Sequence, residues 1–165
     1  MATKLEYKTL NDAITELKDF INDNCVDPIS DAGVTRPSGI GLANDDDEVK
    51  IQNLPKITFE ILTADESERI GAGKTDYRRR HRYEVGIIYI CGKGHTWTYN
   101  STEFKGKKQT VAYLQYLGNQ LVANSTSFCF NELVVGSVSA PIAGPNPHTY
   151  QAMLVIKLDS YGGTV

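Results

Sequence analysis

Residues 77–91 constrain the fold of this chain more than any other segment, because their pattern fits only one kind of secondary structure. Apolar or aromatic side chains recur at every second position, as Tyr83, Val85, Ile87 and Tyr89. Successive side chains of a β-strand point to opposite faces, so this spacing predicts a long strand with one face in the core. The first half of the segment is basic, and we expect it to project beyond the core.

Three more strands are predicted from the same kind of pattern. Residues 56–62 alternate apolar and polar side chains, and a Gly-rich hairpin arm at 63–76 connects them to the long strand. Residues 128–139 and 150–160 are the other two strands, joined by a turn rich in proline. The last strand has one apolar stripe, made of Tyr150, Ala152, Leu154, Ile156 and Leu158.

Two helices are predicted from apolar residues that recur three and four positions apart. The first covers residues 10–24, with Thr9 or Asn11 as its N-terminal cap. The second is capped by Thr110 and ends near Asn124. Its apolar face is expected to consist of Val111, Leu114, Leu117, Leu121 and Val122.

The elements follow the order α-β-β-α-β-β, which predicts an α+β fold with an antiparallel-rich sheet and two helices packed on one face. With 165 residues the chain has about the size of one domain, so we expect a single domain over 1–165. Residues 26–53 have the composition of a long, solvated loop. Loops of this length tend to be functional or to order against a partner.

The face of the sheet away from the helices is predicted to be only half polar. Its expected members are Gln151, Met153, Val155, Lys157 and Asp159 of the last strand, with Ile88 and Ile90 of the long strand. A partly apolar sheet face is usually buried by something. Another subunit and the loop at 26–53 are the two candidates.

Charge and cysteine content exclude several classes of protein. The chain has 17 Lys and Arg against 20 Asp and Glu, a net charge of −3, so it lacks the basic excess of a dedicated DNA-binding protein. Cys25, Cys91 and Cys129 lie far apart among apolar residues, which predicts buried thiols in a reducing compartment. We expect neither a signal peptide at the N-terminus nor a membrane span, since no apolar run approaches ~18 residues.

No residue pattern predicts catalysis, a cofactor or a metal. Residues 71–75, Gly-Ala-Gly-Lys-Thr, end like a phosphate-binding loop, but Glu68 replaces the first glycine and a strand follows in place of a helix. The three histidines each lack a second ligand at the spacing of a metal site. Cys129 lies between two aromatic residues, where a thiol is inert. We therefore predict a protein that is not an enzyme.

The charged feature that stands out is the segment 74–82, with a local charge of +4. Its cations are Lys74, Arg78, Arg79, Arg80 and Arg82, opposed only by Asp76. Alternation along a strand turns Arg79 away from its arginine neighbours. The cluster is expected to meet either nucleic-acid phosphates or an acidic surface of a neighbouring subunit.

We favour the protein contact, because few aromatic residues suited to stacking on bases accompany the cluster. The acidic candidate is the run Asp45, Asp46, Asp47 and Glu48. Reversing the charge of Arg79, Arg80 and Arg82 is then expected to weaken assembly and to leave the monomer folded.

The element order and the Gly-rich charged arm resemble the tail-terminator (tail-completion) family of tailed bacteriophages, as does the stretch 110–117, Thr-Val-Ala-Tyr-Leu-Gln-Tyr-Leu. The likeness covers most of residues 10–161, although the loop at 26–53 is larger than the family leads one to expect. It implies a structural virion protein without a cofactor, assembled in the host cytoplasm into a ring, usually a hexamer. This ring caps the tail tube, meets the head connector and lets genomic DNA pass through its lumen without sequence recognition. By position, residues 63–82 and 26–53 contact neighbouring subunits, tube or connector.

Two other interpretations remain open. A head-completion or neck stopper protein would also form a ring and would differ only in the partners of each face. A small nucleic-acid-binding α+β domain would need exposed aromatic residues beside the arginine strand. The salt dependence of nucleic-acid binding tests the second interpretation.

Overall fold

The computed structural model describes residues 4–5, 9–25, 41–42, 54–69, 79–125 and 132–164. In chain order its elements are β1 (Lys4–Leu5), α1 (Leu10–Asn24), β2 (Gly41–Leu42), β3 (Lys56–Arg69), β4 (Arg79–Gly92), β5 (Thr96–Tyr99), β6 (Thr102–Lys105), α2 (Lys107–Ala123), β7 (Glu132–Val138), β8 (Ile142–Ala143) and β9 (Thr149–Thr164). The fold is α+β, as predicted. The predicted order is incomplete, because the short strands β1, β2, β5, β6 and β8 interrupt it.

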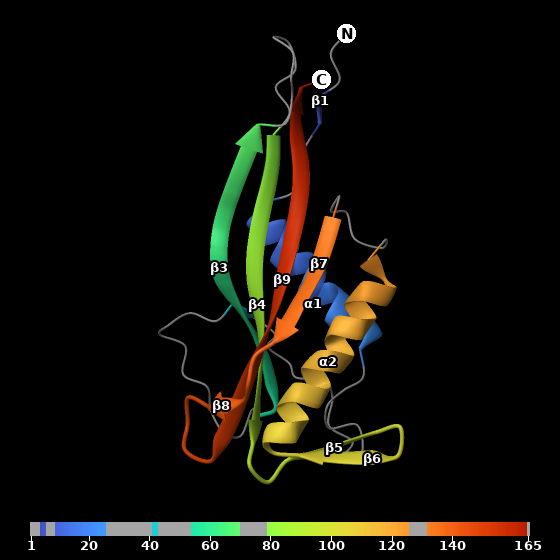
Figure 1. Ribbon diagram of the computed structural model, residues 1–165, viewed down its shortest axis with the longest axis vertical. Helices are drawn as coiled ribbons and strands as arrows, with labels where there is room; N and C mark the ends of the chain where they lie inside the picture. The colour runs from blue at the N-terminus through green and yellow to red at the C-terminus, as the bar shows by residue number, and fades with distance from the viewer. Residues whose placement is uncertain are drawn as a thin grey trace.

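The larger sheet is built around the long strands β3, β4 and β9, which extend over much of the molecule (Figure 1). One edge of β9 pairs with β4, and the other edge pairs in turn with β8, β7 and β1. These pairs and the pair of β3 with β4 are antiparallel, whereas β2 runs parallel to β3. The sheet is therefore antiparallel-rich, as predicted.

Strand β2 lies inside the segment 26–53, which we predicted to be a loop. Gly41 pairs with Thr58 and Leu42 with Phe59 at the edge of the sheet. The remaining residues of that segment lie outside the described residues, so whether they cover a sheet face stays a prediction. In the predicted hairpin arm, residues 63–69 belong to β3, and 70–76 lie outside the described residues.

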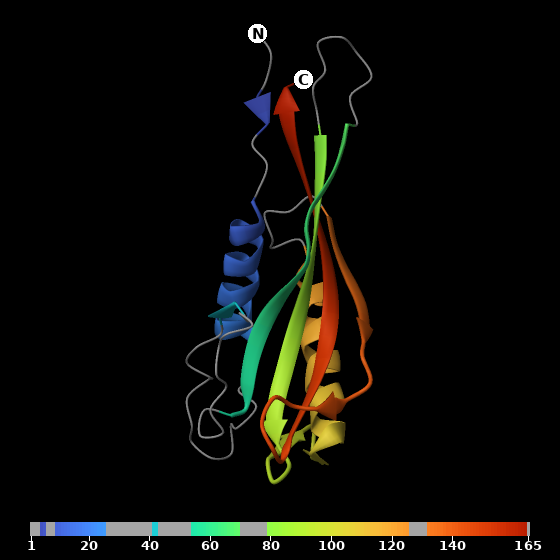
Figure 2. The same cartoon turned by 90° about the vertical axis from the view of Figure 1, so that its left-hand side faces the viewer.

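Both helices cover one face of the sheet, as predicted. The register sets Ile87 beside Phe59 on one side and Leu154 on the other, and these side chains are fully or almost fully buried. The buried residues of α1 and α2 belong to the same core cluster as these three side chains. Seen from the side, α1 stands against the twisted strands (Figure 2). The predicted stripe of Tyr83, Val85, Ile87 and Tyr89 is entirely buried.

The two helices begin in different ways. Thr9 caps α1: its side chain accepts from the Asp12 N–H, and the Asp12 carboxylate accepts from the Thr9 N–H at 2.8 Å. Helix α2 begins at Lys107, so the prediction that Thr110 caps it was wrong. The hydroxyl of Thr110 instead donates to the carbonyl of Lys107 at 2.7 Å. Gly106 holds the N-cap position at a φ of 58°, which glycine adopts without strain.

The hairpin of β5 and β6 was not predicted, and it changes which face of α2 is buried. Trp97 of β5 packs against Tyr113 and Tyr116 of α2, with ring centroids 5.1 Å and 5.7 Å apart. Leu114, Leu117 and Leu121 are buried as predicted, Val111 is half-buried, and Val122 is 59% exposed. Placing Val122 in the core was wrong, because the aromatic contacts rotate the buried side of α2 towards its tyrosines.

Candidate functional site

The sheet face away from α1 and α2, called here the outer face, carries ion pairs at one end of β4 and apolar side chains further along. Arg82 of β4 donates to Asp159 of β9 twice, from Nε to Oδ1 at 2.7 Å and from Nη2 to Oδ2 at 2.9 Å. Arg80 Nη1 lies 3.9 Å from Asp159 Oδ2, and the Asp159 side chain is 2% exposed. This is a buried carboxylate with a bidentate guanidinium partner, the strongest form of side-chain ion pair.

Arg79, Arg80 and Arg82 together form what we call the arginine end. Arg79 is exposed and alternates to the helix side of β4, where His81 is buried. Arg82 is paired with Asp159 of the same chain. Reversing its charge is therefore expected to destabilise the monomer, in addition to weakening any contact with a neighbouring subunit. Lys74, Arg78, Asp45, Asp46, Asp47 and Glu48 lie outside the described residues, so a contact between the two clusters stays a prediction.

Beyond the arginine end, the outer face becomes apolar. Glu84 and Lys157, paired across β4 and β9, form a partly exposed ion pair at 3.2 Å. Further along, the side chain of Met153 lies over Gly86, where an added Cβ would come within 2.5 Å of the sulfur. Val134 is 43% exposed and Ile142 is 57% exposed. Val155, Met153 and Ile88 are half-buried. The outer face thus carries a partly exposed apolar stripe, as the sequence predicted.

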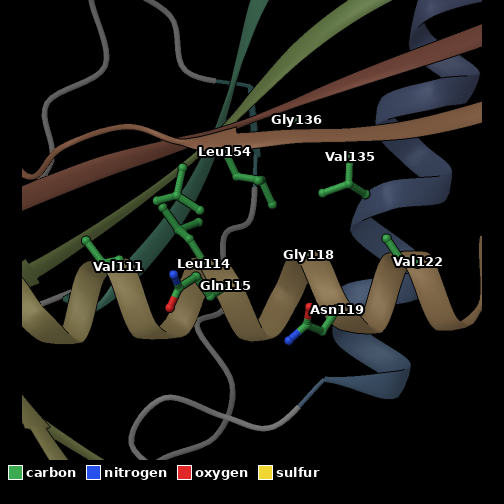
Figure 3. A pocket seen from close by; sticks show the side chains of 10 residues that line it. Val111, Leu114, Gln115, Gly118, Asn119, Val122, Val135, Gly136 and Leu154 are labelled. Atoms are coloured by element: carbon green, nitrogen blue, oxygen red, sulfur yellow. The ribbon is translucent and has the colours of Figure 1, made fainter.

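A groove separates α2 from the edge of the sheet (Figure 3). It has a volume of about 360 Å³. Its lining comprises Val111, Leu114, Gln115, Gly118, Asn119 and Val122 of α2 and Val135, Gly136, Val138 and Leu154 of the sheet. None of these side chains titrates, so the groove offers packing and amide hydrogen bonds but no acid, base or nucleophile. Among the described strands β7 pairs only with β9, which leaves its other edge open beside the groove.

The structure also gathers a group of cations that the sequence analysis missed. Lys93 lies in the turn after β4, and Lys105, Lys107 and Lys108 surround the start of α2. All four are exposed, and we call them the lysine end. Figure 1 places this region at the pole of the molecule opposite to the chain ends. The run Lys105-Gly106-Lys107-Lys108 was the available signal, but nothing in the sequence shows that Lys93 joins it.

Two of the four lysines of the lysine end lie beside the ring of Tyr150 of β9. The Nζ atoms of Lys93 and Lys107 lie 5.4 Å and 5.5 Å from the centre of its ring. The backbone N–H of Lys93 donates to the carbonyl of His148 at 2.8 Å. A Cβ at Gly106 would lie 3.2 Å from the ring, so this glycine allows the chain to pass close to Tyr150.

Burial shifts the pKa of two reactive side chains near the lysine end, Cys91 and His95. Burial raises the pKa of the Cys91 thiol to about 12, so this thiol stays protonated. The prediction of buried thiols is confirmed for Cys25 and Cys91, and Cys129 lies outside the described residues. Burial lowers the pKa of His95. Within the described ranges, no group of three or more His, Cys, Asp or Glu side chains is placed to hold a metal ion.

No helix in the described part of the chain is long and apolar enough to cross a membrane. In comparisons with known proteins, no protein-family model matches the chain, and no curated protein matches it either. The fold is α+β, with a partly exposed apolar stripe on the outer face of its sheet and exposed lysines at one pole.

Proposed function

We propose that this chain is a structural subunit of a virion, a ring-forming tail terminator at the head-proximal end of a phage tail tube, and not an enzyme. The observation that carries this proposal is the apolar stripe of the outer face, where Val134 and Ile142 are each more than two-fifths exposed. Isolated exposed apolar residues are ordinary, but a stripe across neighbouring strands marks a contact surface. In a one-domain chain a second copy is the simplest partner.

Several further features support an assembly role. The edge of β7 that pairs with no other described strand offers backbone groups to a neighbour. The groove beside it is lined by aliphatic side chains together with the amides of Gln115 and Asn119, and it lacks titratable side chains, which suits packing better than chemistry. The core elements α1, β3, β4, α2, β7 and β9 keep the sequence of helices and strands on which the resemblance to tail terminators rests. That resemblance is an argument from fold, and fold alone does not determine function.

In this proposal the ring, a hexamer in the usual case, joins the tail tube to the head connector. Genomic DNA passes through its lumen without sequence recognition. The subunits assemble in the host cytoplasm and remain in the neck of the virion.

The test is the solution mass of the purified protein, measured by light scattering over a range of protein and salt concentrations. The expected result is a species of ring size, or a monomer that assembles when tail tubes are added. Val134→Glu places a charge on the outer face and should prevent assembly. Ile61→Glu is the matched control, because Ile61 is 45% exposed and pairs with the buried Val85, which puts it on the face of the sheet opposite to the outer face. A strict monomer with and without tubes, or equal behaviour of the two variants, would contradict the proposal.

A further inference from the structure

The lysine end differs from the arginine end because, among the described residues, its cations have no anionic partner. Over the residues that the structure describes, no carboxylate forms an ion pair with Lys93, Lys105, Lys107 or Lys108. Residues 93–108 contain these four lysines and one acid, Glu103, for a local charge of +3, while the whole chain has a charge of −3. Like charges gathered at one pole repel each other, and a bound anion would relieve that repulsion.

The backbone beside the lysines is also electropositive. Helix α2 has 17 residues, and the N–H groups that begin a helix point outwards from its terminus. From the third residue on they have partners here, since the N–H groups of Gln109 and Thr110 donate to the Gly106 carbonyl at 3.1 Å and 3.3 Å. No side chain caps this terminus, and its first turn contains no acid. The terminus alone would not make a site, but it adds a partial positive charge to the four ammonium groups.

The kind of cation indicates the kind of anion. All four are lysines, which bind phosphates as point charges and lack the planar fork that pairs with carboxylates. Lysine is also depleted from protein interfaces relative to the rest of the surface. Nothing in the cluster provides the donor and acceptor pattern needed to read bases. These features favour a polyphosphate backbone over an acidic protein surface.

We propose that the lysine end binds the phosphate backbone of double-stranded nucleic acid without sequence recognition. Lys93 and Lys107, held beside the same ring of Tyr150, contact phosphates, and Lys105 and Lys108 extend the contact along the backbone. This binding does not require the ring of the proposed function, because one subunit carries the complete cluster.

The test measures binding of the full-length protein to a short fluorescent DNA duplex as the salt concentration rises. Each phosphate contact contributes about 0.9 to the slope of log affinity against log salt, so four lysines give a slope of about −3.6. Between 50 and 200 mM salt, this slope corresponds to a loss of affinity of about 150-fold. Removing two contacts with Lys93→Gln and Lys107→Gln should halve the slope and reduce the loss to about 12-fold.

The matched control is the double variant Lys18→Gln and Lys157→Gln. It removes the same charge from α1 and from the middle of β9, where Lys157 pairs with Glu84 and not with the end of β4, and should leave the slope unchanged. Circular dichroism checks that both variants are folded. Absence of binding at low salt, or an equal loss in both double variants, would overturn the proposal.

Two further probes separate the remaining outcomes. A second duplex of different sequence should bind with the same affinity, and a tenfold preference for one duplex would contradict recognition of the backbone alone. Poly-glutamate replaces DNA in the last experiment. If the lysine end binds poly-glutamate but not DNA, its partner is an acidic protein and the assignment to nucleic acid fails.

Discussion

The arginine end and the lysine end are both clusters of cations, yet the molecule uses them differently. At the arginine end, Arg82 forms two hydrogen bonds to Asp159, whose carboxylate is buried, so its charge is neutralised inside the chain. At the lysine end, the ammonium groups of Lys93 and Lys107 lie over the neutral ring of Tyr150. A dense run of charge in a sequence is therefore no guide to a binding site until the partners of each charge are known.

The largest difference between the two ends should appear in stability. Arg82→Ala leaves the Asp159 carboxylate buried without its bidentate partner, which we expect to lower the free energy of unfolding by about 3 kcal/mol. Urea unfolding followed by circular dichroism measures the change. The control is Lys107→Ala, where an exposed side chain is lost and the expected cost is about 0.5 kcal/mol.

A double variant shows why Arg82 matters. Arg82→Met combined with Asp159→Leu removes both charges, and we expect it to recover most of the stability that Arg82→Ala loses, because the penalty comes from a buried carboxylate that keeps only the longer contact with Arg80. If Arg82→Ala costs no more than Lys107→Ala, the ion pair is not structural and the comparison between the ends fails.

A smaller effect on stability should show whether the aromatic ring of Tyr150 contributes through its contacts with the two lysines or only through the volume that it fills. Tyr150→Leu removes the contacts with Lys93 and Lys107 and should lower the free energy of unfolding by about 1 kcal/mol. Tyr150→Phe keeps the ring and is the matched control. Both substitutions are then repeated in the variant that carries Lys93→Gln and Lys107→Gln. If the contacts with the lysines matter, the free energies of unfolding of the leucine and phenylalanine variants should differ less in this background. An unchanged difference would mean that packing, and not the cations, accounts for the effect.

Local patterns predicted the scaffold well. The alternation of Tyr83, Val85, Ile87 and Tyr89 found the buried face of β4, because a period of two has one structural meaning. The first helix was predicted at roughly residues 10–24 with Thr9 or Asn11 as its cap, and it runs from Leu10 to Asn24 with Thr9 as the cap, because the cap and the apolar spacing are local to the segment.

The sequence failed where contacts come from distant parts of the chain. The burial of α2 depends on Trp97 of the β5–β6 hairpin, which no pattern inside α2 reveals. The role of Arg82 depends on Asp159, which lies 77 positions away along the chain. The lysine end needs Tyr150 to bring Lys93 beside Lys107. The contacts of Arg82 with Asp159 and of Lys93 with Tyr150 depend on the register of β4 with β9, which local periodicity does not specify.

The smallest expected effect concerns the imidazole of His95, in the turn that follows Lys93. Its Nδ1 accepts a long hydrogen bond from the Gly92 N–H at 3.4 Å, and burial lowers its pKa from the ordinary 6.5. Protonation would replace this acceptor by a donor and add charge in a partly buried site.

Because the folded pKa lies below the unfolded one, the unfolded chain binds more protons as the pH approaches 6.5 from above. The contribution of His95 to stability is therefore complete above pH 6.5 and is lost as the pH falls through the lowered pKa. Melting temperatures of the wild type and His95→Gln, compared between about pH 5 and 8, isolate this contribution from the other titrating groups. We expect the two curves to converge at the acid end, where the wild type has lost its advantage. If the two curves run parallel instead, folding does not change the pKa of His95, and burial does not disfavour its charged form.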